Sequence, residues 1–136
     1  MFASTRLKDP VLVRKIDVSV VVSAAFIIDH ALNKGVSFSF LSRLLYELRE
    51  RGFKMGLCKR FTKQPDGFFS EDVNALIGHW STADLMRVNG DEESPIEVTE
   101  EGYKYFREIL VEELEREPAQ LLNLANVVLS LIAEQR

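Results

Sequence analysis

The chain has 136 residues, 46% of them apolar and 28% charged, which is typical of a globular domain able to bury a core without covalent staples. A single cysteine, Cys58, excludes an internal disulfide and a thiolate-rich metal site, and it fits a reducing, cytoplasmic setting. The longest apolar run, Val18 to Ile28, is too short to cross a bilayer, and no secretory signal precedes it.

The net charge of −4 hides an asymmetry along the chain. Residues 1–65 hold 12 Lys or Arg and 5 Asp or Glu, a charge of +7, whereas residues 66–136 hold 5 and 16, a charge of −11. Either the charges mix over the folded surface, or the molecule is bipolar and can self-associate or offer a basic face to a polyanion.

The N-terminal half predicts two helices behind an extension of residues 1–16, in which Asp9-Pro10 favours a helix start although the following apolar residues also suit a strand. A helix that is apolar on most sides is expected from Asp17 to Lys34, ended by Gly35. An amphipathic helix follows, capped by Ser37 or Ser39 and ended by Gly52. Its inward residues are Leu41, Leu44, Leu45 and Leu48, and its outward ones are Ser42, Arg43, Glu47, Arg49 and Glu50.

Residues 53–69 change character and are expected to be extended or to form a small hairpin, since Pro65-Asp66-Gly67 has turn chemistry. Ser70 then caps a third helix, with Trp80 as a core anchor. Two β-like runs, 85–88 and 96–98, flank a turn at Asn89-Gly90-Asp91.

Thr99 caps the next helix, whose inward residues are Tyr103, Phe106, Leu110 and Leu114. The last helix, Ala119 to about Glu134, carries apolar residues on one face and beside it: Leu121, Leu124, Val128 and Leu131, then Leu122, Ala125, Leu129 and Ile132. So much apolar surface either packs on the first helix or meets a second copy, and we expect a homodimer.

This order predicts a mainly α, α+β fold: a winged helix-turn-helix domain over residues 17–117 with a two-stranded wing, followed by an additional C-terminal helix over 118–136. Two motifs support it, PDGFFSEDV before the third helix and VTEEGYKYF after the wing. With them, residues 18–115 resemble the small prokaryotic, largely archaeal, YwgA-like winged-helix family, which has YGPYSEDL and LTEKGREYL at these places. The resemblance implies a DNA-binding function, assigned to that family by fold analogy. This chain departs from the family where Gly67-Phe68-Phe69 replaces a proline-tyrosine pair.

Ordinary DNA readout by the third helix and the wing is disfavoured. The third helix has no Lys or Arg, begins with Glu71-Asp72, and offers only Asn74 and His79 to bases, while the wing tip is Asp91-Glu92-Glu93. The connection of residues 53–69 is also longer than a helix-turn-helix turn.

Basic residues gather between positions 43 and 63 and form a candidate basic patch. Either this patch contacts a DNA backbone, or its side chains are simply solvated around buried Phe53 and Phe61. Its candidate nucleic-acid-binding residues are Arg43, Arg49, Lys54, Lys59, Arg60 and Lys63. We therefore expect either a DNA-binding regulator, with double-stranded DNA as partner, or a protein–protein adaptor that uses the acidic wing and the last helix.

Enzymatic chemistry is the third possibility and has few candidates. Asp29-His30 is either an oriented general base or a polar pair at a helix end, and His79 a surface residue. Cys58 is either an activated thiol or a half-buried one. The glutamates Glu112, Glu113, Glu115 and Glu117 point to different helix faces and are expected to be solvated. We predict no catalytic residue, no metal, no cofactor and no small-molecule substrate.

Overall fold

The computed structural model describes residues 16–54, 61–64 and 67–135, and it describes side chains outside positions 61–69. The expectations for residues 1–15 and for Cys58 lie outside these ranges. Within them the protein is mainly helical with two small antiparallel sheets, which confirms the α+β class.

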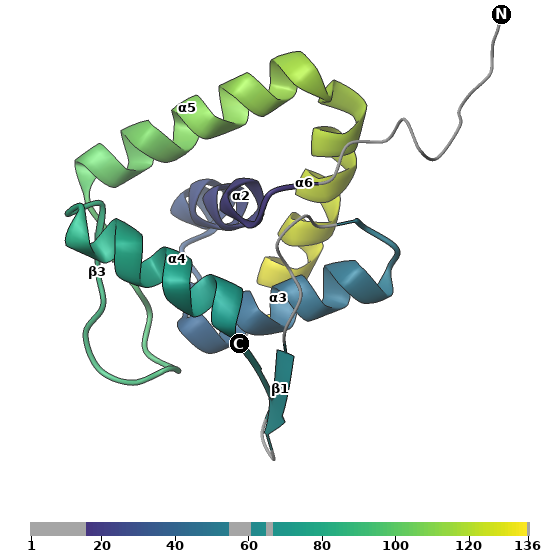
Figure 1. The fold of residues 1–136 in the computed structure, drawn as a ribbon. Helices are drawn as coiled ribbons and strands as arrows, with labels where there is room; N and C mark the ends of the chain where they lie inside the picture. The colour runs from purple at the N-terminus through teal and green to yellow at the C-terminus, as the bar shows by residue number, and fades with distance from the viewer. Residues whose placement is uncertain (1–15, 55–60, 65–66, 136) are drawn as a thin grey trace, which may run out of the picture.

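Helix α2 (Val18–Leu32) forms the centre of the molecule (Figure 1). Val21, Val22 and Ala25 are fully buried because this helix is apolar on most sides. It contacts all the other helices of the described chain: α3 (Phe38–Glu50), α4 (Glu71–Thr82), α5 (Glu100–Arg116) and α6 (Pro118–Ala133). The left-handed residue at its end is Asn33, with φ of 56°, and not the expected Gly35, which has a positive φ in the loop beyond.

An aromatic cluster joins α2 to α4 and α5. The ring of Phe106 stacks on Phe26 at 5.6 Å between centroids and contacts Trp80 at 4.7 Å. Trp80 is 3% exposed, so the prediction that it anchors the core is confirmed.

Helix α3 starts at the cap Ser37, whose hydroxyl accepts a hydrogen bond from the N–H of Phe40. The predicted leucine stripe is buried. The prediction that Ser42 faces water is wrong, because Ser42 is fully buried. Its hydroxyl accepts from the N–H of Ser70 at 3.2 Å, and thereby connects α3 to the start of α4. Ser70 in turn caps α4, since its hydroxyl accepts from Val73 N–H, as predicted.

Between α3 and α4 the chain forms a hairpin of β1 (Phe61–Gln64) and β2 (Gly67–Ser70). The strands are antiparallel, with Gln64 opposite Gly67 at the turn. The hairpin prediction is thus confirmed for the backbone, and β2 runs directly into α4.

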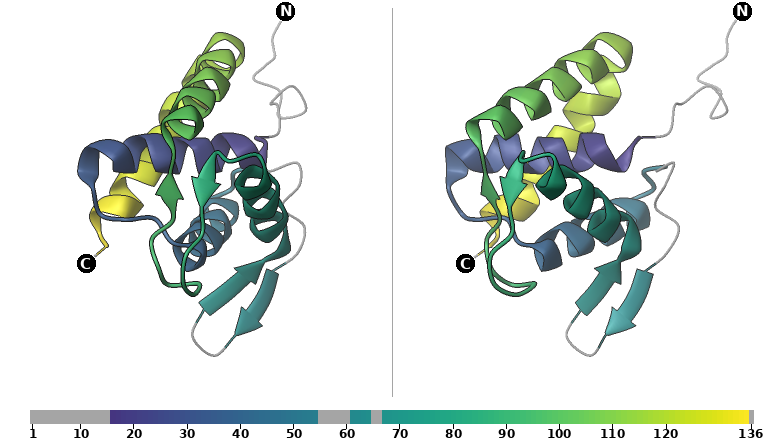
Figure 2. Two further views of the ribbon diagram at one scale, coloured as in Figure 1. Left: turned by 90° about the vertical axis from the view of Figure 1, so that its left-hand side faces the viewer. Right: turned by 60° about the vertical axis from the view of Figure 1, so that its left-hand side comes forward.

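The second hairpin follows α4 and consists of β3 (Met86–Arg87) and β4 (Glu97–Val98). The loop between them is connected to the segment before α3, because Ile96 N–H donates to the Val36 carbonyl at 2.8 Å and Ser37 forms a β-bridge with Pro95. Figure 2 shows both hairpins projecting from the same side of the helical core, away from α5.

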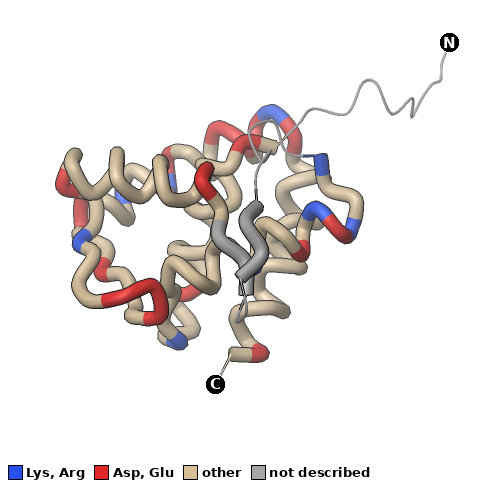
Figure 3. Tube along the Cα trace, turned by 60° about the horizontal axis from the view of Figure 1, so that its bottom comes forward, with Lys and Arg blue, Asp and Glu red and all other residues tan. Residues whose placement is uncertain are grey.

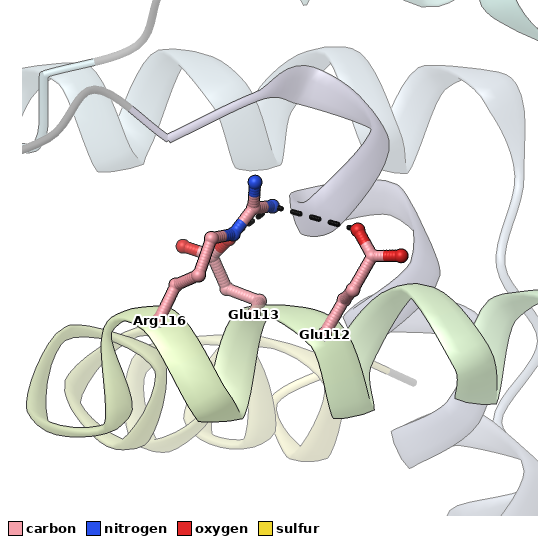
Figure 4. A network of polar contacts seen from close by, with 3 residues as sticks. All are labelled: Glu112, Glu113 and Arg116. Carbon is pink, nitrogen blue, oxygen red and sulfur yellow. Dashed lines mark hydrogen bonds and ion pairs between the residues drawn. The ribbon is translucent and has the colours of Figure 1, made fainter.

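The cap of α5 is Thr99, as predicted, whose hydroxyl accepts from Gly102 N–H at 3.0 Å. The inward face of α5 differs from the expectation after Phe106: Leu114 is 53% exposed, and Glu113 is buried instead, at 4% exposure. The glutamates at 112, 113, 115 and 117 are expected from the sequence to be solvated, and this expectation is wrong for Glu113. Its carboxylate lies 3.3 Å from the guanidinium of Arg116 (Figure 4). Helix α6 then packs across α2 and α5.

Candidate binding surfaces

A groove of about 380 Å³ lies between α4, the start of α3 and the β3–β4 loop, and is called here the α4–loop groove. Its apolar lining comes from Phe38 at the start of α3, from Ile77 on α4, and from Val88, which is 44% exposed. Its lining residues are Phe38, Asn74, Ile77, Val88, Gly90, Asp91 and Glu92. The sequence did not predict that these residues form one surface, because they come from three separate segments of the chain.

The rim of this groove is acidic and its backbone is held in place. Asp91, Glu92 and Glu93 are exposed at the loop tip, where Figure 3 shows them as a red arc. The loop is attached to α3 through the Ser39 N–H, which donates to the Glu92 carbonyl at 2.9 Å. The side chain of Asp91 accepts from Glu93 N–H at 2.9 Å and from the hydroxyl of Ser94 at 3.2 Å. The loop therefore presents concentrated negative charge from a turn stabilised by its own hydrogen bonds.

The candidate nucleic-acid-binding residues are only partly described. Arg43, Arg49 and Lys54 are exposed on or just after α3. Lys59 and Arg60 lie outside the described residues, and Lys63 is placed only by its backbone, opposite Phe68 in the first hairpin.

The exposed side of α3 is of mixed charge. Arg43 has Glu47 and Glu50 four and seven residues further on, which puts all three on one side of the helix. Glu47 also lies 4.0 Å from the guanidinium of Arg51. Arg49 lies over the ring of Tyr46, at 5.7 Å from its centroid. These acids dilute the positive charge that a DNA backbone requires.

A second hollow of about 450 Å³ lies where the end of α3 meets the start of α6. Arg51 and Lys54 line it from one side, and Ala119, Gln120 and Asn123 line it from the other. The predicted Lys54 thus faces residues of α6, which the sequence pattern had not brought together with it.

Asp29 and His30, interpreted above as either a general base or a polar pair at a helix end, lie at the C-terminal end of α2. The carboxylate of Asp29 accepts hydrogen bonds from the N–H of Lys34 at 2.8 Å and of Gly35 at 3.1 Å, and so closes the end of α2. The ring of His30 lies against that of Tyr103, 4.1 Å between centroids. Burial, and then the negative charge of Asp29, raise the pKa of the Tyr103 phenol.

No group of three or more His, Cys, Asp or Glu side chains in residues 16–54, 61–64 and 67–135 is placed to hold a metal ion. Across the same ranges, no helix has both the length and the apolarity needed to traverse a bilayer.

Comparison with known proteins assigns no relative. No protein-family model, curated protein or solved structure matches the chain.

Proposed function

We propose that this chain is a non-enzymatic interaction module with a winged helix-turn-helix fold, and that its α4–loop groove binds a basic segment of a partner protein. The observation that carries the proposal is the combination of an apolar groove with an acidic loop at its rim. Double-stranded DNA is the second candidate ligand.

The order and pairing of the elements support the winged-helix assignment. Helices α2, α3 and α4 precede the β3–β4 hairpin, and the segment Val36–Ser37 lies along its loop through an isolated β-bridge to Pro95 and a backbone hydrogen bond from Ile96. In this arrangement α4 is the third helix and the β3–β4 loop is the wing. The β1–β2 hairpin is an addition, because a helix-turn-helix joins its helices by three or four residues. Membership of the YwgA-like family is a proposal of the same kind.

A basic protein segment fits the groove better than a phosphate backbone does. Lys or Arg side chains would be attracted by Asp91, Glu92 and Glu93, and an apolar side chain would cover Val88 and Ile77. The same carboxylates repel phosphate, so a duplex in the position used by most winged helices would meet like charge at the wing.

DNA remains a candidate through a different surface. Arg43, Arg49 and Lys54 are exposed on or just after α3, and Lys59, Arg60 and Lys63 follow Lys54 in the sequence. Such a surface would hold the backbone without reading bases, so the affinity would be independent of sequence and would fall steeply with salt.

Fluorescence anisotropy with two labelled probes separates the ligands: a random-sequence duplex of about 20 base pairs, near two helical turns, and a peptide of alternating Lys and Leu. Each is titrated at low and at physiological salt. The adaptor proposal expects the peptide to bind and the triple variant D91N/E92Q/E93Q to weaken it about tenfold or more. Its matched control is E101Q/E108Q/E115Q, which removes three exposed acids from α5 and keeps peptide binding.

The DNA candidate expects the opposite pattern. The duplex binds at low salt, and R43A/K54A reduces this binding, whereas K104A/R107A on α5 does not. Peptide affinity that is equal for the loop variant and for its α5 control would overturn the groove assignment. A duplex that fails to bind at low salt would remove the DNA candidate.

A further inference from the structure

The outer face of α6 differs from the exposed faces of the other helices. No charged residue occurs between Pro118 and Ala133, whereas α3, α4 and α5 all carry exposed Asp, Glu, Lys or Arg. Leu122 is 66% exposed and Leu129 43% exposed, with the exposed amide of Asn126 between them. These three residues, at helical spacing on one side of α6, are called the α6 stripe.

The orientation of the stripe is set by the contacts on the opposite side of the helix. Leu124, Val128, Leu131 and Ile132 are buried in the core. The end of the helix is attached to the loop before α3, because the side-chain amide of Gln135 donates to the Gly35 carbonyl at 2.9 Å. The α6 stripe therefore faces outward as a consequence of how α6 packs.

The stripe has the symmetry that self-docking requires. Leu122 and Leu129 are seven residues apart, about two helical turns, and Asn126 lies near their midpoint. In an antiparallel pair of α6 helices with the two-fold axis at Asn126, Leu122 of one copy lies near Leu129 of the other. Asn126 then meets its own counterpart, and an amide both donates and accepts, so the two can satisfy each other.

Electrostatics permit this arrangement along the stripe. No Asp, Glu, Lys or Arg lies between Pro118 and Ala133, so two copies of an acidic chain meet there without like charges in contact. At the ends of the pair, Glu134 of one copy lies near the N-terminus of the other α6, where the partial positive charge is offset by the carboxylate of Glu117. The apolar contacts along the stripe, and not the helix ends, therefore hold the pair together.

We propose that a second copy of this chain covers the α6 stripe and forms an antiparallel two-fold dimer centred on Asn126. The proposal goes beyond the groove and its ligand, since none of the residues lining the α4–loop groove belongs to α6. A 16-residue helix is about 24 Å long. One helix pair buries less than the roughly 800 Å² per partner of a strong interface, so we expect a dissociation constant in the micromolar range.

Sedimentation equilibrium of the full chain from about 1 µM to about 1 mM tests the dimer itself. We expect a monomer–dimer transition inside this range. A chain that stays monomeric at the highest concentration overturns the proposal, and a foreign partner would then be the occupant of the stripe.

A charge exchange at position 126 tests the two-fold register. N126D and N126K each place like charges together at the axis and are expected to weaken the dimer about tenfold or more, whereas their equimolar mixture restores association. N123D and N123K make the same changes on a neighbouring exposed face of α6 and are expected to leave the dimer unchanged. Circular dichroism checks that every variant is folded. A dimer that ignores N126D, or a mixture that does not recover, overturns the proposed interface.

Discussion

Gly102 is a position where a small substitution is expected to lower the stability of the protein strongly. It lies buried in the first turn of α5, directly against Leu85, the residue before β3. A Cβ added at this position would collide with the carbonyl oxygen of Leu85, and it would also lie 2.9 Å from Cγ1 of Val98. The Gly102→Ala substitution therefore forces α5 and the hairpin apart.

The cost follows from what the shift disturbs. The Leu85 carbonyl accepts two hydrogen bonds from Thr99, both at 3.1 Å, one from its N–H and one from its hydroxyl. Losing them costs roughly 2 kcal/mol, and forcing a methyl group into a filled site costs about 1–3 kcal/mol. Alanine regains about 1 kcal/mol in helix propensity. The expected net loss of unfolding free energy is about 3 kcal/mol, a large share of a typical domain's stability.

Urea unfolding followed by circular dichroism measures the loss, expected as a lower midpoint by roughly 2 M. Gly78→Ala is the matched control, since Gly78 is also helical but is exposed and has nothing within 4 Å of an added Cβ. That control should gain about 1 kcal/mol. If Gly102→Ala is as stable as the wild type, α5 does not approach the hairpin as closely as the structure has it.

Three further substitutions test single contacts. Ser23→Ala should stabilise the protein by about 0.5–1 kcal/mol, because the buried hydroxyl has no hydrogen-bond partner within the described ranges. Arg116→Ala should destabilise it by about 1–2 kcal/mol, because it leaves the buried Glu113 carboxylate without this ion pair, and adding Glu113→Gln should recover most of the loss. Tyr103→Phe should lose less stability than the wild type as pH rises above about 10, because burial and Asp29 raise the pKa of Tyr103 in the folded state. The unfolded phenol ionises first, so its contribution is complete below the unfolded pKa and is lost as pH rises through the folded pKa.

Each of these has a measurement that can contradict it. Urea midpoints decide the first two: a destabilised Ser23→Ala would mean that the hydroxyl has a partner, and a neutral Arg116→Ala would mean that Glu113 does not depend on the guanidinium. For Tyr103→Phe, unfolding free energies are compared between pH 8 and about pH 11, around the phenol's ordinary range. Parallel curves for variant and wild type would show that its phenol titrates normally in the folded protein.

Local interactions explain why so much of the element order could be predicted. The caps Ser37, Ser70 and Thr99 each accept a hydrogen bond from a residue three positions further on, so the whole signal lies within one turn. The apolar stripe of α3 and the turn glycine Gly52 are local in the same sense. These features depend on residue type and spacing, which the sequence states directly.

Burial at the edges of the helices could not be predicted in this way. Glu113 is buried and Leu114 exposed because the angle at which α5 crosses its neighbours decides which of two adjacent residues points inward. Ser42 is buried because a residue 28 positions later brings its N–H to the hydroxyl. Neither fact is encoded in the spacing of apolar residues on one helix.

For the candidate surfaces too, some features follow from the sequence and others only from the tertiary structure. The residue order alone determined that residues 91–93 form an acidic turn and that residues 118–133 carry no charge. Only the tertiary structure decided that the acidic tip borders a groove with Val88 and Ile77, and that α6 turns Leu122 and Leu129 outward. The physical reason is that a surface is made by segments far apart in the chain, and their meeting depends on how the helices pack around α2.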